Sequence, residues 1–130
     1  MQVTMFYAGV LALLFLVLSV RVIQGRTGPA GVNLGDGGNA GLLRRIRGHG
    51  NFAEYVPLIL VMLAMLEAGG LPKMWVHGFG ATLLVSRLLH GYALSFSEKF
   101  MFGRFWGTTL TLLLLIVLGG LCVWRALPAL

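Results

Sequence analysis

The sequence RGHGNFAEYVPLILVMLAML, residues 47–66, joins a polar segment directly to a strongly apolar one. Its first part carries Arg47, His49, Asn51 and Glu54, and its second part is as apolar as a membrane-spanning segment. A helix needs about 20 residues to cross the roughly 30 Å hydrocarbon core of a bilayer. The apolar part is too short for this unless the helix also includes the polar residues. The stretch therefore predicts a membrane helix that carries charged groups into the bilayer.

The composition indicates a membrane domain. Of the 130 residues, 58% are hydrophobic and only 11% are charged, and the length allows one compact domain. The formal net charge is +6, from ten lysines and arginines against four acidic residues. In a soluble protein this excess would suggest a nucleic-acid partner. Here the preference of membrane proteins for basic cytoplasmic loops explains much of the charge, so no nucleic-acid partner is expected.

Four apolar segments predict an all-α fold, an integral membrane four-helix bundle in a single domain over residues 1–130. The expected helices cover residues 3–23, 40–68, 73–97 and 104–126. The first segment lacks a basic start and a cleavage site, so we expect it to stay as a helix. The glycine-rich segment 24–41 contains no phosphate-binding loop pattern, and Asn39 is the expected N-cap of the second helix.

The distribution of basic residues predicts the orientation in the membrane. Residues 21–47 carry five arginines and residues 97–104 add two more basic residues, whereas the opposite ends offer only Lys73 and Arg125. By the positive-inside rule, the first and third loops face the cytoplasm and both termini lie outside.

Polar residues line one face of the second predicted helix. At about 100° per residue, Arg44, Arg47, Asn51 and Glu54 fall within an arc of about 80°, which Tyr55 extends. An unpaired carboxylate at this depth costs several kcal/mol. We therefore expect Glu54 to face protein, a cation or water.

The third predicted helix carries groups that match this polar stripe. Arg87 and His90 are three residues apart and share a face, level with the stripe if the two helices are antiparallel. Arg104 is expected to join them from the fourth helix and Arg21 from the first. A buried ion-pair network, Glu54 with an arginine, is a simpler alternative. It does not explain the excess of arginines, which predicts an anionic ligand with carboxylates and no metal site.

The remaining ionisable residues have simpler interpretations. His49 points away from the stripe and His77 lies at the outer interface, so neither is expected to act in the site. Glu67 and Glu98 are expected to be solvated helix ends. Three basic residues are expected only to set the topology: Arg26, Arg45 and Lys99.

These motifs resemble those of a known family. RGHGNFAEYVPL (47–58) is similar to the R-x-x-x-N-x-x-E-x-x-P signature of the MAPEG family, the membrane-associated proteins in eicosanoid and glutathione metabolism. SRLLHGY (86–92) matches the R-x-x-H pattern of the family's third helix, and GDGGNAGLLRRIRGHGN (35–51) looks like the small bacterial members. The resemblance covers most of the chain. It implies a homotrimer in a bacterial inner membrane, surrounded by membrane lipids.

The resemblance also implies a ligand and residue roles. Glutathione, as co-substrate, would bind between neighbouring subunits near the cytoplasmic leaflet. Arginines would hold its carboxylates through forked hydrogen bonds, and Glu54 would suit its ammonium group. The implied glutathione-binding residues are Arg21, Arg47, Asn51, Glu54, Tyr55, Arg87 and His90. Arg104 matches the catalytic arginine that the family holds near the sulfur.

The implied activity is that of a glutathione transferase or peroxidase. A thiol with a pKa of about 8.5 is mostly protonated at neutral pH, and the guanidinium of Arg104 would favour the thiolate. The thiolate would attack a lipophilic small molecule arriving from the bilayer, or reduce a hydroperoxide. Leu94 and Thr108 stand where eicosanoid-making relatives carry tyrosines, which counts against eicosanoid synthesis.

Two other classes of function stay open on the sequence alone. A non-catalytic binding or scaffold protein would keep the polar pocket without efficient activation of the thiol. A small transporter would use Glu54 as a proton or cation site. Transporters usually place such sites near mid-bilayer in broken helices, whereas the polar residues here gather toward one side. An enzyme of detoxifying type is the leading hypothesis.

Overall fold

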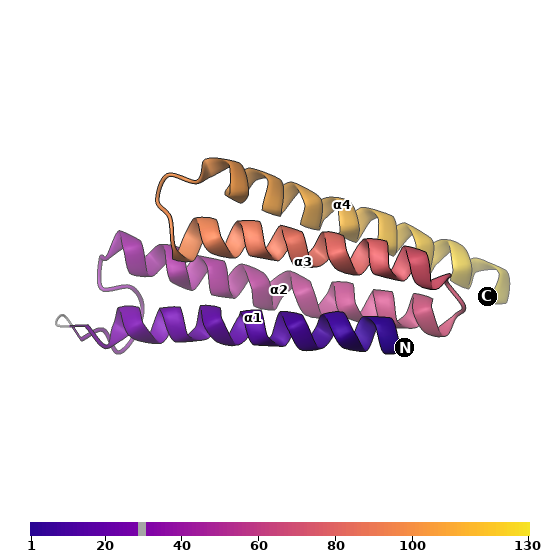
Figure 1. Cartoon of the computed structure of the whole chain (residues 1–130), viewed down its shortest axis with the longest axis horizontal. Coiled ribbons are helices and arrows are strands. Elements are labelled where there is room, and N and C mark those ends of the chain that lie inside the picture. Colours follow the sequence, from indigo (N-terminus) through magenta and orange to yellow (C-terminus); the bar gives the residue numbers. More distant parts are fainter. Residues whose placement is uncertain (29–30) are drawn as a thin grey trace.

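The computed structural model describes every residue except 29–30 and contains four long helices (Figure 1). These are α1 (Gln2–Arg26), α2 (Ala40–Ala68), α3 (Lys73–Ser95) and α4 (Met101–Ala126). A short 3-10 helix, η1 (Leu127–Ala129), follows α4. The helices run alternately up and down, so that both termini and the α2–α3 turn lie at one end of the bundle. The α1–α2 and α3–α4 connections lie at the other end, which we call the arginine end. The predicted all-α fold is confirmed.

The helix ends differ by a few residues from those predicted. α2 spans the predicted range 40–68, and the side chain of Asn39 accepts a hydrogen bond from the backbone N–H of Leu42 (3.0 Å), as expected of its N-cap. The other bounds shift: α1 continues to Arg26, α3 ends at Ser95 and α4 begins at Met101. The earlier start of α4 places Arg104 inside this helix instead of at its first residue.

Three of the four helices are long and apolar enough to span a membrane: α1, α2 and α4. The span of α4 includes η1. α3 is not among them, although its length of about 34 Å would suffice. It carries Arg87 and His90, and it packs against each of the other three helices. Both side chains are buried, so protein and not lipid surrounds them. The expectation of four apolar spans is thus corrected to three, and α3 packs against the other helices while Val85 and Leu88 stay exposed on its outer face.

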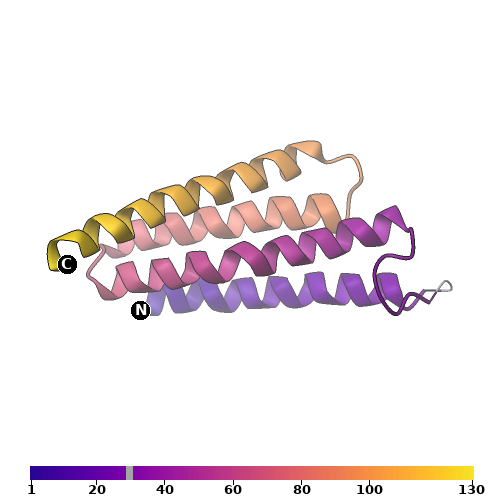
Figure 2. The ribbon, with the colours of Figure 1, turned by 180° about the vertical axis from the view of Figure 1, so that it is seen from behind.

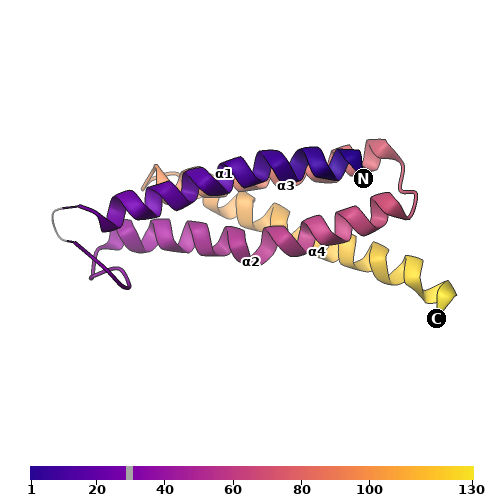
Figure 3. The same cartoon turned by 90° about the horizontal axis from the view of Figure 1, so that it is seen from below.

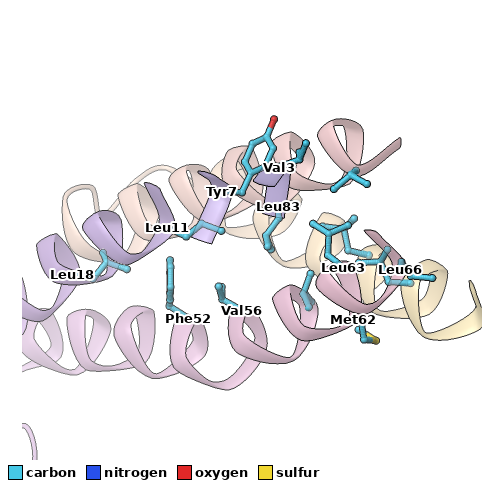
Figure 4. Packing of buried hydrophobic residues seen from close by; sticks show 14 residues of the cluster. Val3, Tyr7, Leu11, Leu18, Phe52, Val56, Met62, Leu63, Leu66 and Leu83 are labelled. Carbon is cyan, nitrogen blue, oxygen red and sulfur yellow. The ribbon is translucent and has the colours of Figure 1, made fainter. Parts of the chain in front are cut away.

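The core lies among the four helices (Figure 4). Buried apolar residues interleave there, including Val3, Tyr7, Leu11 and Leu18 of α1, Phe52, Val56 and Leu63 of α2, Leu83 of α3, and Leu114 and Leu118 of α4. α4 packs mainly on α3 and crosses the direction of the other helices at an angle (Figure 3). Large apolar side chains remain exposed on the outer faces of α1 and α4, which suits contact with lipid tails.

Two glycines bring α4 close to α3. A Cβ atom added at Gly107 would lie 2.7 Å from the Cβ of His90 and 2.7 Å from the carbonyl oxygen of Ser86. One added at Gly103 would lie 2.8 Å from the carbonyl oxygen of Leu89. The glycines are four residues apart and share one face of α4. They therefore let the two helix backbones approach more closely than a larger side chain would allow.

Glu67, at the end of α2, caps the start of α1. Its carboxylate accepts hydrogen bonds from the backbone N–H groups of Val3 (3.0 Å) and Thr4 (2.8 Å) and from the Thr4 hydroxyl (2.6 Å). Its side chain is only 7% exposed, so the expectation of a solvated Glu67 is wrong, whereas Glu98 is exposed as expected. The first N–H groups of a helix lack partners and carry positive partial charge, and both properties favour a carboxylate there.

Gly107→Ala should destabilise the protein by about 1–3 kcal/mol, because the added methyl group overpacks the contact between α3 and α4. Gly119→Ala is the matched control on the same helix, since a Cβ at Gly119 meets no atom within 4 Å and alanine favours the helix. Thermal unfolding of both variants in detergent measures the difference. Equal unfolding temperatures would contradict the close packing of α4 on α3.

Glu67→Ala should lower the free energy of unfolding by about 1–2 kcal/mol, because the first N–H groups of α1 lose their acceptor. Glu98→Ala serves as the control and should change stability by less than about 0.5 kcal/mol, because the side chain is exposed. Denaturation of the purified variants in the same detergent gives both values. A loss no larger for Glu67→Ala than for Glu98→Ala would rule out the cap.

Candidate functional site

A pocket of about 320 Å³ opens at the arginine end among α2, α3 and α4. Figure 2 shows the ribbons of these three helices from behind. The pocket is lined by Leu43, Arg44, Arg47 and Asn51 from α2, by His90 and Leu94 from α3, and by Arg104 and Thr108 from α4. We call it the α2–α4 pocket. Four residues predicted for the site therefore meet in one place: Arg47, Asn51, His90 and Arg104. The lining holds three guanidinium groups and no carboxylate.

Arg44 joins α2 to the end of α3. Its guanidinium donates to the carbonyl oxygen of Ala93 (2.7 Å) and to that of Ser97. It also lies 3.8 Å from the carboxylate of the exposed Glu98. The last carbonyl groups of a helix lack partners within it and carry negative partial charge, so a guanidinium is stable there. Arg44 therefore forms a wall of the pocket with part of its donor capacity already used.

Arg87 is buried beneath the pocket and does not line it. Only 1% of the residue is exposed. Its guanidinium donates to Oδ1 of Asn51 (2.8 Å), to the carbonyl oxygen of Gly107 (2.9 Å) and to the hydroxyl of Thr111. All three acceptors are neutral. The direct ligand contact implied for Arg87 is thus not the arrangement found in this chain, where Arg87 holds Asn51 instead.

The bond from Arg87 orients the side chain of Asn51. A guanidinium can only donate hydrogen bonds, so Asn51 turns its amide oxygen toward Arg87. The amide nitrogen of Asn51 is then the group left to donate into the α2–α4 pocket. Together with Arg47 and Arg104, it gives the pocket a lining of hydrogen-bond donors and positive charge. This lining suits an anionic ligand.

Glu54 lies outside the pocket. Its side chain is exposed, and it forms no ion pair with any residue that the structure describes. The simpler alternative, an ion pair of Glu54 with Arg47 or Arg87, is therefore not found within the described residues. Tyr55 is half-buried and packs against the apolar core. A carboxylate on the outer face of a membrane-spanning helix is costly in lipid, so Glu54 is still expected to face water, a cation or another protein chain.

Arg21 also lies apart from the α2–α4 pocket. Its guanidinium donates to the carbonyl oxygen of Ser95 (2.9 Å) and lies 4.6 Å from the centre of the Phe96 ring. It lines a separate cavity with Arg44 and Arg45. Across the described part of the chain α1 makes no contact with α4. For this reason the expected convergence of Arg21 with Arg104 does not occur within one chain.

The two histidines expected outside the site do lie elsewhere. Nε2 of His49 is 3.1 Å from the hydroxyl oxygen of Ser19, and its ring stacks on Phe15. Nδ1 of His77 is 3.3 Å from the hydroxyl oxygen of Tyr7. Over residues 1–28 and 31–130, no three side chains of His, Cys, Asp or Glu gather as metal ligands would.

The sequence does not single out Ser86 and Thr111, although both surround Arg87. The hydroxyl of Thr111 lies 3.3 Å from that of Ser86, and both residues are buried. A signal was present, because Gly107 and Thr111 are four residues apart and share one face of α4. Helical spacing alone, however, does not tell which residue of α3 that face meets.

Comparison with known proteins adds independent findings. The sequence model of the MAPEG family matches residues 4–124. The chain is 38% identical over 91 residues to the inner membrane protein YecN of Escherichia coli strain K12. The aligned residues cover 70% of this chain and 69% of YecN. YecN of Escherichia coli O6:H1 strain CFT073 aligns with the same identity and coverage. No solved structure matches.

Thr111→Val should destabilise the protein by about 1–2 kcal/mol, because Arg87 stays buried with one acceptor fewer. Thr109→Val makes the same change on the same helix and is the matched control, since Thr109 takes no part in this network. Chemical unfolding of the two variants in detergent provides the comparison. Equal stabilities would mean that the hydroxyl of Thr111 does not support Arg87.

Proposed function

We propose that this chain, which belongs to the MAPEG family, binds glutathione in the α2–α4 pocket and activates its thiol for reaction with a lipophilic electrophile. One observation carries the proposal: three arginines and no carboxylate line the pocket, within a bundle of membrane helices. Glutathione is a small tripeptide with two carboxylates. Guanidinium groups bind carboxylates through paired, charge-assisted hydrogen bonds.

Different residues of the pocket would bind different groups of glutathione. Arg47 is exposed and is the best-placed group for a ligand carboxylate, because Arg44 is bound to the end of α3. The amide nitrogen of Asn51 would donate to the peptide, and His90 would contact it from α3. Arg87 would act indirectly, by holding the Asn51 amide in place.

The proposal includes a homotrimer with glutathione between neighbouring subunits. The exposed carboxylate of Glu54 supports it, since lipid cannot accept this group on the outer face of α2. At a subunit boundary Glu54 would meet the ammonium group of the ligand, with Tyr55 beside it. Arg21 is left out of the ligand contacts, because it lines another cavity.

Arg104 would be the catalytic residue that stabilises the thiolate of glutathione. It lines the pocket from α4, and its exposed guanidinium is not among the groups that hold the helices together in the described residues. A guanidinium beside the sulfur lowers the pKa of the glutathione thiol and favours the thiolate. The thiol proton leaves to water, the sulfur forms a bond to an electrophilic carbon, and the leaving group departs with its electron pair. With a hydroperoxide, the thiolate would instead attack the terminal oxygen, and the O–O bond would break to release the alcohol after protonation. A second glutathione would then convert the resulting sulfenic acid to the disulfide and water.

The protein is an integral membrane protein, as three apolar helices and the inner membrane relatives indicate. We further propose that the arginine end faces the cytoplasm, because basic residues concentrate in cytoplasmic loops. Both termini would then lie outside. A lipophilic substrate would reach the pocket sideways from the bilayer.

A non-catalytic binding or scaffold protein is the second candidate. The observation that favours it is the presence of Leu94 and Thr108 in the pocket lining. Neither side chain supplies the phenol hydroxyl of the tyrosines in eicosanoid-making relatives, so thiol activation would depend on Arg104 alone. Wild-type protein that binds glutathione without any thiolate absorbance would favour this candidate.

Arg104→Ser should lower turnover of glutathione with an aryl-halide acceptor by at least about tenfold, because one charge that stabilises the thiolate is lost. Glutathione affinity should fall much less, since Arg47 still holds a carboxylate. Arg104→Lys should keep part of the rate. Steady-state kinetics and the ultraviolet absorbance of bound thiolate measure these effects.

Lys99→Ser is the matched control for Arg104→Ser, because it removes one positive charge from the exposed α3–α4 connection without touching the pocket. It should keep wild-type turnover and thiolate absorbance. If Arg104→Ser also kept both, Arg104 would be only a membrane-interface anchor and the proposed chemistry would fail.

A further inference from the structure

A second cavity at the arginine end contains buried polar groups that the fold does not use. It has a volume of about 130 Å³ and lies where α1 ends, α2 begins and α3 ends. We call it the Arg21 cavity, after the residue that lines it from α1. Within the described residues, two buried side-chain atoms lack a hydrogen-bond partner: Nε of Arg21 and the hydroxyl oxygen of Ser95. Both residues line this one cavity.

Unpartnered donors in a buried place call for an acceptor. Leaving a buried polar group unsatisfied costs about 1–3 kcal/mol, so native proteins rarely leave two in one place without a ligand or water. Ser95 is only 4% exposed. Its hydroxyl and the Nε–H of Arg21 can both donate to the same group. A ligand with two or more acceptor oxygens would satisfy both.

The charge of the Arg21 cavity favours an anion. Arg21, Arg44 and Arg45 line it, and the one carboxylate in the lining belongs to Glu98, whose side chain is 82% exposed. The carbonyl groups at the end of α3 would repel an anion. Two of the arginines already cover those groups, because Arg21 donates to Ser95 and Arg44 to Ala93.

The position of Arg21 is set before any ligand arrives. One terminal nitrogen donates to the carbonyl oxygen of Ser95 (2.9 Å), the other to the side chain of Gln24 (3.2 Å), and the guanidinium stacks over Phe96. Nε has no partner within the described residues, and its direction is fixed by the other three contacts. A preorganised donor loses little entropy on binding.

The size of the cavity limits what can enter. Its volume of about 130 Å³ is less than half that of the α2–α4 pocket at about 320 Å³. A tripeptide does not fit there, but a single charged group does. Donors line the cavity from three helices, Arg21 from α1, Arg45 from α2 and Ser95 from α3, and a phosphate group has three strong acceptor oxygens that would serve them.

We propose that the Arg21 cavity binds one phosphate group, held by Arg21, Arg45 and the hydroxyl of Ser95, at a site beside the glutathione pocket, with which the cavity shares Arg44 and Leu94 in its lining. The cavity lies at the end of the membrane-spanning helix α1, beside the exposed aromatic residues Tyr92 and Phe96, where lipid headgroups meet the protein. Basic pockets between membrane helices are known to hold anionic lipid headgroups. The phosphate of an anionic phospholipid and free phosphate share this chemistry.

Ser95→Ala is the decisive variant. The hydroxyl has no partner within the described chain, so its removal should leave the unfolding temperature of the delipidated protein unchanged. Binding of the phosphate group should weaken about tenfold, because a hydrogen bond to a charged group is lost. Arg45→Gln should weaken binding as well. Arg26→Gln removes the same charge at the same end without lining the cavity, and should bind as the wild type does.

The experiment uses the full chain, delipidated in maltoside detergent, with two probes. The first is inorganic phosphate, compared with chloride at equal ionic strength. The second is dioleoylphosphatidylglycerol in mixed micelles, compared with dioleoylphosphatidylcholine. The unfolding temperature of the wild type should rise by several degrees with a bound probe, and native mass spectrometry should count one bound lipid per chain. A rise with the lipid alone identifies a lipid headgroup, and a rise with both probes shows that the phosphate group suffices.

Three outcomes would overturn the proposal. The first is no rise with either probe. The second is an equal rise in the wild type, Ser95→Ala and Arg45→Gln. The third is a loss of glutathione affinity in Ser95→Ala with phosphate binding intact, which would join the cavity to the glutathione pocket. The proposal does not depend on glutathione binding, so a wild type that ignores glutathione but responds to phosphate would still support it.

Discussion

The guanidinium of Arg87 is buried inside an apolar bundle and needs hydrogen-bond acceptors there. The way that α2, α3 and α4 pack together supplies these acceptors. A buried charge without partners costs several kcal/mol. α2 supplies the amide oxygen of Asn51, and α4 supplies the carbonyl of Gly107 and the hydroxyl of Thr111. The carbonyl is within reach because Gly107 lets the backbone of α4 approach that of α3. The side chain of Arg87, on α3, therefore holds α2 and α4 against α3 through its hydrogen bonds.

The acceptors around Arg87 are neutral, and this has a consequence for the pocket above it. A carboxylate partner would cancel the charge, whereas amide, carbonyl and hydroxyl oxygens only solvate it. The positive charge of Arg87 therefore adds to those of Arg47 and Arg104, which line the pocket. Charges interact more strongly in a protein interior than in water. An anion in the pocket would be stabilised by Arg87 as well, although Arg87 does not line the pocket.

The sequence predicts the helices well because lipid imposes a simple rule on them, a long apolar run with a cap such as Asn39 at its start. It also predicts that Arg47, Asn51, His90 and Arg104 meet, because helical spacing puts each on a definable face. It does not show which neighbour each face meets. Glu54 and Arg87 therefore look like partners in the sequence but are not paired in the chain. Glu67 looks solvated because its partner, Thr4, lies 63 residues away.

The end of α3 connects the fold to both cavities at the arginine end. α3 packs against each of the other three helices, and the last carbonyl groups of a helix need donors from outside it. Arg21 from α1 and Arg44 from α2 supply them here. A guanidinium has five N–H groups and a helix end uses only some of them. The same arginines therefore keep donors free beside the end of α3, and these are donors that the two proposed anion sites would use.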